Sequence, residues 1–253
     1  MPSNELTPKE RMVRALSGQK TDVLPAVPAY LSLFLADFER AYYVEQYRRC
    51  LQGGCRYVID HEEDAWFRAQ ALYQSYGIFK EKPDWIEVHQ GASRTWTERT
   101  EIVAEGQVLY YEDQVSGARV PMHKAPLPYG DPGLLSQSAS LTDLWDISVQ
   151  LQSEADVDAC LPILTTDELL VCGGFDLPRQ VISDYGNHYF ISTILETPFS
   201  SAYDLLGFQG LMLTQQDRPA LLHHILKRNL QRSQEMMGAW AAVGVHGVYV
   251  EEV

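Results

Sequence analysis

The C-terminal part of the chain, residues 197–253, most constrains the fold, because it places two helices and a strand in a fixed order. A short helix is expected from 198, a long amphipathic helix over about 218–243, and an apolar strand over 245–250. Helix–strand units of this kind build α/β folds. The residues expected at the helix boundaries are Pro198 and Gly207 for the first helix, and Asp217 as the cap and Gly244 as the end of the second.

Upstream segments show the same alternation of helices and strands. Thr7, Pro8 and Glu10 form a capping-box pattern that begins a helix ending at Gly18. Strands separated by helices favour parallel pairing, in either a (β/α)8 barrel or a doubly wound sheet. No glycine-rich nucleotide-binding motif follows any strand, which disfavours a nucleotide-binding doubly wound sheet. The further expected helices cover 35–51, about 63–76, short segments from 153 and 165, and 176–185, and the expected strands cover 24–30, 84–89 and 188–195.

Residues 94–123 interrupt this alternation. Apolar and polar residues alternate there in three runs separated by Gly106 and Gly117. This pattern predicts a β-hairpin or three-stranded meander inserted into the main fold. Residues 125–150, rich in Pro, Gly and Ser, are expected to form a loop.

Composition limits the classes of function. The chain has 253 residues, 45% hydrophobic and 21% charged, so we expect one globular domain over 1–253. A net charge of −14 argues against nucleic-acid and anionic-membrane partners. The four cysteines have no metal-ligand spacing. With no secretory h-region at the N-terminus and no apolar run near the roughly 18 residues of a membrane span, the sequence predicts a cytoplasmic protein.

Three motifs together resemble one family. The opening LTPKERMVRALSGQKTDVLPAVP, the segment PFSSAYDLLGF followed by a DRP helix start, and the ending GVHGVYVEEV occur in this order in the uroporphyrinogen decarboxylase superfamily. The resemblance covers residues 5–30 and 175–253. The excursion at 94–123 is similar to the methyltransferase-like branch of that superfamily.

The resemblance implies a TIM-type (β/α)8 barrel with its site at the C-terminal mouth of the strands. The superfamily contains tetrapyrrole decarboxylases, which are lyases of porphyrin biosynthesis, and zinc-dependent methyltransferases that work with a corrinoid protein. The decarboxylases carry an Arg-x-Ala-Gly-Arg loop after the first strand, whereas here no arginine occurs between Pro28 and Arg40. A substrate with many carboxylates needs fixed guanidinium groups. We therefore expect an enzyme that moves a methyl group between a corrinoid or small methyl donor and a thiol acceptor, with tetrapyrrole decarboxylation as the alternative.

The zinc ligands of such methyltransferases, a His-x-Cys and a distant Cys, would lie beyond residue 253, so no metal site is expected within this chain. Roughly three strands of the eight in a closed barrel are also missing. The sequence therefore predicts an incomplete barrel from a C-terminally truncated fragment. A non-catalytic remnant or binding protein is the third hypothesis.

Two carboxylates are the first candidate catalytic residues. Glu251 and Glu252 follow an apolar strand, where barrel enzymes place their chemistry. Either could donate or accept a proton, although adjacent strand residues point to opposite faces, so at most one faces the mouth. The alternative is a polar loop entry.

Three further residues are candidates. His89 ends the strand at 84–89 and could act as an acid, a base or a ligand, with a structural histidine as the alternative. By resemblance, Tyr203 occupies the position of a decarboxylase site tyrosine, whereas the alternative is packing against the barrel. Tyr30 follows the first expected strand and could line the substrate cavity.

Overall fold

The computed structural model describes residues 5–27, 31–77, 83–122 and 151–251, with the backbone alone for 31–38 and 251. The fold is mixed α/β, as the sequence predicts. The chain divides into two compact units. Unit 1 contains residues 1–132, 172–193 and 245–247, and unit 2 contains 133–171, 194–244 and 248–253.

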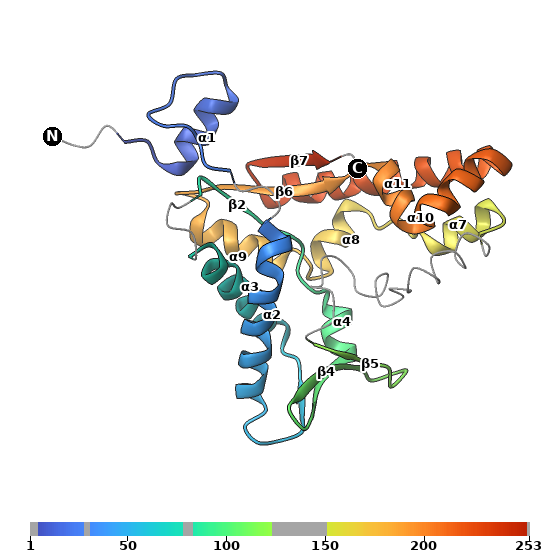
Figure 1. Cartoon of the computed structure of the whole chain (residues 1–253), viewed down its shortest axis with the longest axis horizontal. Helices are drawn as coiled ribbons and strands as arrows, with labels where there is room; N and C mark the ends of the chain where they lie inside the picture. The colour runs from blue at the N-terminus through green and yellow to red at the C-terminus, as the bar shows by residue number, and fades with distance from the viewer. Residues whose placement is uncertain (1–4, 28–30, 78–82, 123–150, 252–253) are drawn as a thin grey trace. The chain divides into compact units, whose positions relative to one another are not determined.

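Four of the described helices of unit 1 lie close to their predicted positions. Helix α1 (Pro8–Leu16) begins with the predicted capping box, in which Thr7 and Glu10 bond each other's backbone. Helices α2 (Leu31–Cys50) and α3 (His61–Tyr76) pack side by side, and α9 packs on α3 (Figure 1). Asp60 caps α3 by accepting a hydrogen bond from the Glu63 N–H. Helix α9 (Asp176–Tyr185) has the bounds that its sequence predicts.

The predicted meander is present as part of a four-stranded antiparallel sheet with the order β1-β3-β4-β5. Its bounds differ from the prediction, because residues 94–99 form a helix, α4 (Arg94–Arg99), capped by Ser93. The three strands of the meander therefore begin at residue 100. The strands are β1 (Arg56–Val58), which the sequence did not predict, β3 (Thr100–Glu105), β4 (Val108–Asp113) and β5 (Arg119–Pro121).

One core joins this antiparallel sheet to α2 and α3. Its buried side chains come from both helices and from the sheet face that they cover. Burying this apolar surface is the main stabilising contribution in this region. The buried members are Tyr43, Tyr47, Leu51, Ile59, Phe67, Ala71, Ile102, Leu109 and Met122.

A second sheet contains three strands in the order β2-β6-β7, namely β2 (Trp85–Glu87), β6 (Phe190–Glu196) and β7 (Gly247–Glu251). Strands β2 and β6 pair in parallel, with Ile86 opposite Ile191. This agrees with the prediction that helix-separated strands pair in parallel. Neither sheet of the described residues closes into a barrel.

The strand expected over 24–30 is wrong where it can be checked. Residues 24–27 form no strand, and 28–30 lie outside the described part. Pro25 has no backbone N–H to donate to a sheet ladder, which explains why this segment stays irregular.

Unit 2 contains four described helices, α7 (Glu154–Cys160), α8 (Thr166–Val171), α10 (Pro198–Asp217) and α11 (Pro219–Val243). The helix that begins at Pro198 ends at Gly207 as predicted, because Gly207 has the non-helical angles φ 66° and ψ 167°. A second helical segment, which the sequence did not predict, follows this kink to Asp217, and α10 covers both segments. Asp217 is thus the last residue of α10, and Arg218 takes the N-cap position of α11 without a side-chain cap bond. Gly244 ends α11 in a left-handed conformation, as predicted.

The core of unit 2 lies among α7, α10 and α11. Buried leucines of α10 and α11 pack on Val157 of α7, which is fully buried.

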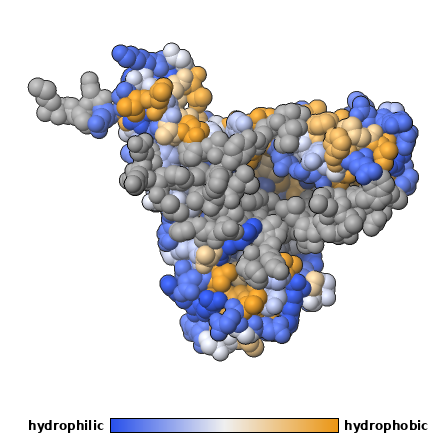
Figure 2. Space-filling view, viewed as in Figure 1, coloured by the Kyte–Doolittle hydropathy of each residue, from blue (hydrophilic) through white to orange (hydrophobic). Residues whose placement is uncertain are grey.

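In the described residues, no helix has both the length and the apolar character needed to cross a membrane. Hydrophilic residues make up much of the face shown in Figure 2, in keeping with the net charge of −14.

Candidate functional site

The carboxyl end of β2 brings a carboxylate and an imidazole together. Ile86 and Val88 point to one side and are 3% and 0% exposed. Glu87 and His89 alternate with them and therefore point to the opposite side. His89 Nε2 lies 3.0 Å from Glu87 Oε1, and the two side chains are 21% and 13% exposed. The pair is thus shielded but within reach of solvent.

Strand β6 places a buried hydroxyl beside this pair. Ser192 is opposite Glu87 in the parallel register, so both side chains lie on the same face of the sheet. Ser192 is 2% exposed, and its Oγ has no hydrogen-bond partner among the described residues. Most buried hydroxyls are hydrogen-bonded, so an unsatisfied one needs an explanation.

Glu39 of α2 supplies a second carboxyl group. Ser75 of α3 donates a hydrogen bond to Glu39 Oε1 at 3.4 Å. Burial raises the pKa of the Glu39 carboxyl to about 7, although the charges of His89 and Arg68 and the bond from Ser75 act in the opposite direction. A carboxyl group with this pKa can both give and take a proton near neutral pH. We call Glu39, Ser75, Glu87, His89 and Ser192 the β2-end cluster.

A buried ion pair lies between the same two helices. Arg68 of α3 donates hydrogen bonds to Asp64, and the Tyr47 hydroxyl donates another to the same carboxylate. The Arg68 guanidinium also lies 5.1 Å from the centre of the Tyr43 ring. Burial raises the pKa of both tyrosines well above the ordinary value, so both stay protonated and Tyr47 can act as a donor to Asp64. This arrangement holds Arg68 in place, and the charge of Arg68 in turn acts on Glu39.

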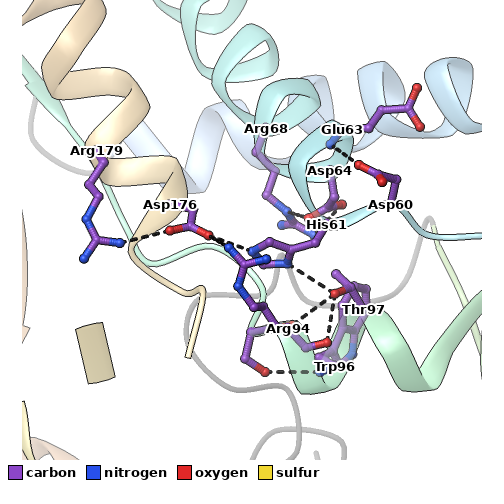
Figure 3. A network of polar contacts seen from close by, with 11 residues as sticks. Asp60, His61, Glu63, Asp64, Arg68, Arg94, Trp96, Thr97, Asp176 and Arg179 are labelled. Atoms are coloured by element: carbon purple, nitrogen blue, oxygen red, sulfur yellow. Dashed lines mark hydrogen bonds and ion pairs between the residues drawn. The ribbon is translucent and has the colours of Figure 1, made fainter. Parts of the chain in front are cut away.

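A second polar network, drawn in Figure 3, joins α3, α4 and α9. His61 Nε2 lies 3.1 Å from Asp176 Oδ2, and His61 Nδ1 lies 3.2 Å from Thr97 Oγ1. Arg94 and Arg179 donate to the Asp176 carboxylate at 2.7 and 3.0 Å. All of these residues belong to unit 1.

The absence of a side chain at Gly173 lets Arg94 and His61 of this network lie against the backbone. Its φ is +94°, and a Cβ there would lie 2.7 Å from both Arg94 Cγ and His61 Nε2. The Arg94 N–H also donates to the Cys172 carbonyl at 2.7 Å. Only a residue without a side chain lets the backbone come this close to both groups.

Asp176, His61 and Thr97 are arranged like a catalytic triad, in which a carboxylate orients a histidine base and the base activates a hydroxyl nucleophile. The Thr97 hydroxyl, however, donates to the Arg94 carbonyl at 2.9 Å, and Thr97 is 1% exposed. The single hydroxyl proton of Thr97 thus points to the Arg94 carbonyl and not to His61, so His61 is not placed to act as its base. The network therefore fixes the three helices to one another, and the β2-end cluster remains the candidate site.

The structure places the predicted site residues in different ways. His89 lies in the β2-end cluster. Tyr203 lies on α10 in unit 2 and is 39% exposed. Glu251 ends β7, but its side chain lies outside the described part, as do Glu252 and Tyr30 entirely.

Three members of the cluster were not predicted as site residues from the sequence, namely Glu39, Glu87 and Ser192. Glu87 could have been found, because it precedes His89 by two residues and so shares its strand face. Ser192 could be placed on that face only once the register was known. Glu39 gives no local signal, since tertiary packing alone buries it.

Within the described residues, no group of three or more His, Cys, Asp or Glu side chains could hold a metal ion. No protein-family model matches the chain, and no curated protein gives a significant sequence match.

Proposed function

We propose that this chain is a methyltransferase-like enzyme of the uroporphyrinogen decarboxylase superfamily. It would move a methyl group between a corrinoid or small methyl donor and a thiol acceptor. The three sequence motifs support this proposal, and they fall on α1, on α10 with the start of α11, and on β7. In this proposal β2, β6 and β7 are neighbouring strands of a (β/α)8 barrel, which agrees with the parallel pairing of β2 and β6.

The observation that carries the proposal is the β2-end cluster. Acid–base groups gather where a parallel strand ends, which is where barrel enzymes place their active sites. A thiol that accepts a methyl group forms a carbon–sulfur bond and loses its proton, while the bond between the methyl carbon and its donor breaks. His89, held by Glu87 at 3.0 Å, is suited to take that proton, and Glu39 provides a second acid–base group nearby.

The other predicted residues keep their proposed roles. Glu251 and Glu252 are proposed proton donors or acceptors after β7, and Tyr203 and Tyr30 are proposed substrate contacts. The superfamily implies zinc and a corrinoid protein partner. The described residues include no set of side chains that fits zinc, so no step of the proposal passes through a metal.

The test is a methyl-transfer assay on the purified chain with methylcobalamin and a small thiol. We expect loss of the methylcobalamin absorbance and formation of the methyl thioether, measured by mass spectrometry. His89→Gln should lower the rate by about 10²-fold or more if His89 is the base. His224→Gln is the matched control, because His224 pairs with Asp158 on unit 2 at 2.9 Å, outside the cluster.

Two outcomes would contradict the proposal. The first is the absence of any thioether with either donor, methylcobalamin or a small methylated compound. The second is conversion of uroporphyrinogen III to coproporphyrinogen by this chain, which would establish the decarboxylase alternative.

A further inference from the structure

The Ser192 hydroxyl is buried on β6 without a partner among the described residues. A buried hydroxyl without a hydrogen bond destabilises the folded state, because it has lost its water and gained nothing. Alanine would fit the same position on the strand without this cost. A bound molecule that hydrogen-bonds Ser192 Oγ would explain the presence of the hydroxyl.

The groups around Ser192 define the chemistry of that molecule. Glu87, the register partner of Ser192, presents a carboxylate on the same face, with His89 at 3.0 Å. Glu39, close enough for its pKa to respond to the charge of His89, adds a second carboxyl group. The guanidinium of Arg68, whose charge acts on Glu39, already bonds Asp64. The face therefore presents acceptor oxygens from Ser192, Glu87 and Glu39, with Glu87 shared with His89, and these oxygens suit a cationic donor better than an anion.

We propose that the face formed by Glu87 and Ser192 binds a small organic molecule through a protonated amine. An ammonium group has three N–H donors and no acceptor, so it can bond the Glu87 carboxylate and the Ser192 oxygen at once. The bond to Glu87 is charge-assisted and is the stronger of the two. Partial exposure of Glu87 and His89, at 13% and 21%, gives the molecule access from solvent.

Binding should also release protons near neutral pH. A cation on this face favours the carboxylate form of Glu39, as the charge of His89 already does, so the bound state holds fewer protons than the free state. The release should be largest near pH 7, where Glu39 is about half protonated in the free protein. Titration calorimetry in buffers of different ionisation enthalpy measures this release directly.

The experiment is calorimetric titration of the full chain with methylammonium and dimethylammonium, with acetamide and acetate as neutral and anionic probes. We expect the ammonium ions to bind and acetate not to bind. Ser192→Ala and Glu87→Gln should each weaken ammonium binding by about tenfold or more. Thr214→Val is the matched control, because Thr214 of α10 is likewise buried, at 1% exposed, and its hydroxyl has no partner among the described residues, yet it belongs to unit 2.

Ser192→Ala gives a second readout that a structural role would not produce. The variant should be as stable as the natural chain or more stable without ligand, while its affinity for ammonium falls. Unchanged affinity in Ser192→Ala, equal binding of acetate and ammonium, or no ammonium binding at millimolar concentration would each overturn the proposal. The inference does not depend on methyl transfer, since ammonium binding without thioether formation would contradict the proposed function alone.

Discussion

Asp64 and Arg68 face each other one turn apart on α3, and their side chains are 1% and 4% exposed. Removing one member of such a pair leaves the other charge buried without compensation. We expect Asp64→Ala to lower the free energy of unfolding by about 3–5 kcal/mol. Urea denaturation monitored by circular dichroism measures this loss.

The matched control is the exposed pair Glu45–Arg49 on α2, which has the same i,i+4 spacing at 2.9 Å. Its side chains are 47% and 67% exposed, so Glu45→Ala should cost about 0.5 kcal/mol or less. Equal losses in the two variants would show that burial does not determine the strength of the Asp64–Arg68 contribution.

Glu39 should make stability depend on pH. Its pKa is raised from 4.5 to about 7 in the folded protein, so the folded state binds the proton more tightly than the unfolded chain does. The stabilising contribution of Glu39 to the free energy of unfolding is fully present below about pH 4.5, and it is lost as the pH rises through about 7. The loss amounts to about 3 kcal/mol at 1.36 kcal/mol per pH unit.

Comparison with Glu39→Gln isolates this effect. Urea unfolding gives the free energy of unfolding of the natural chain minus that of Glu39→Gln. This difference should fall as the pH rises from about 4.5 to about 7. Gln46→Ala on the same helix removes no ionisable group and should give a difference that is nearly independent of pH. A flat profile for Glu39→Gln would contradict the prediction.

Gly173 tests the network of Figure 3. Alanine there must keep φ near +94° and place its Cβ 2.7 Å from Arg94 Cγ and His61 Nε2. We expect a cost of about 1–2 kcal/mol from the backbone and a further cost of about 1–3 kcal/mol from overpacking. Gly106→Ala, at φ +59° with nothing within 4 Å of its Cβ, should show the backbone cost alone. The difference between the losses of unfolding free energy in Gly173→Ala and Gly106→Ala measures the steric cost at Gly173. Equal losses would contradict the predicted steric cost.

Gly207 should hold the kink of α10. Its φ of 66° and ψ of 167° belong to a region that is essentially restricted to glycine. We expect Gly207→Ala to lower the unfolding free energy by about 1–3 kcal/mol. A stability gain would instead mean that α10 straightens and that alanine acts through helix propensity. Thermal unfolding followed by circular dichroism distinguishes these outcomes.

Local chemistry made the helix boundaries the most predictable part of the fold. The capping box of Thr7 and Glu10, the bounds of α9 and the left-handed Gly244 follow from side chains within a few residues of each boundary. Parallel pairing of helix-separated strands was also predictable, because chain connectivity restricts the topology. Helix α4 was not, since its residues alternate like a strand, although Ser93 caps them as a helix.

The candidate site was predictable only in part. His89 was found because it ends a strand, but apart from Glu87 the other members of the cluster come from α2, α3 and β6. The burial that raises the pKa of Glu39 and leaves Ser192 without a partner is a product of tertiary packing. No periodicity in the sequence carries that information.

The parallel pairing of Trp85 with Phe190 also affects when the site forms during folding. The meander needs only neighbouring residues, since Gly106 and Gln107 alone separate β3 from β4. Closing the long loop between β2 and β6 costs chain entropy before any contact is gained, so this pairing should form late. Pulse-labelled hydrogen exchange should protect the amides of β3 before those of β6. The acid–base groups at the end of β2 would therefore assemble last, so a newly made chain could hold a folded meander while its chemistry is still absent.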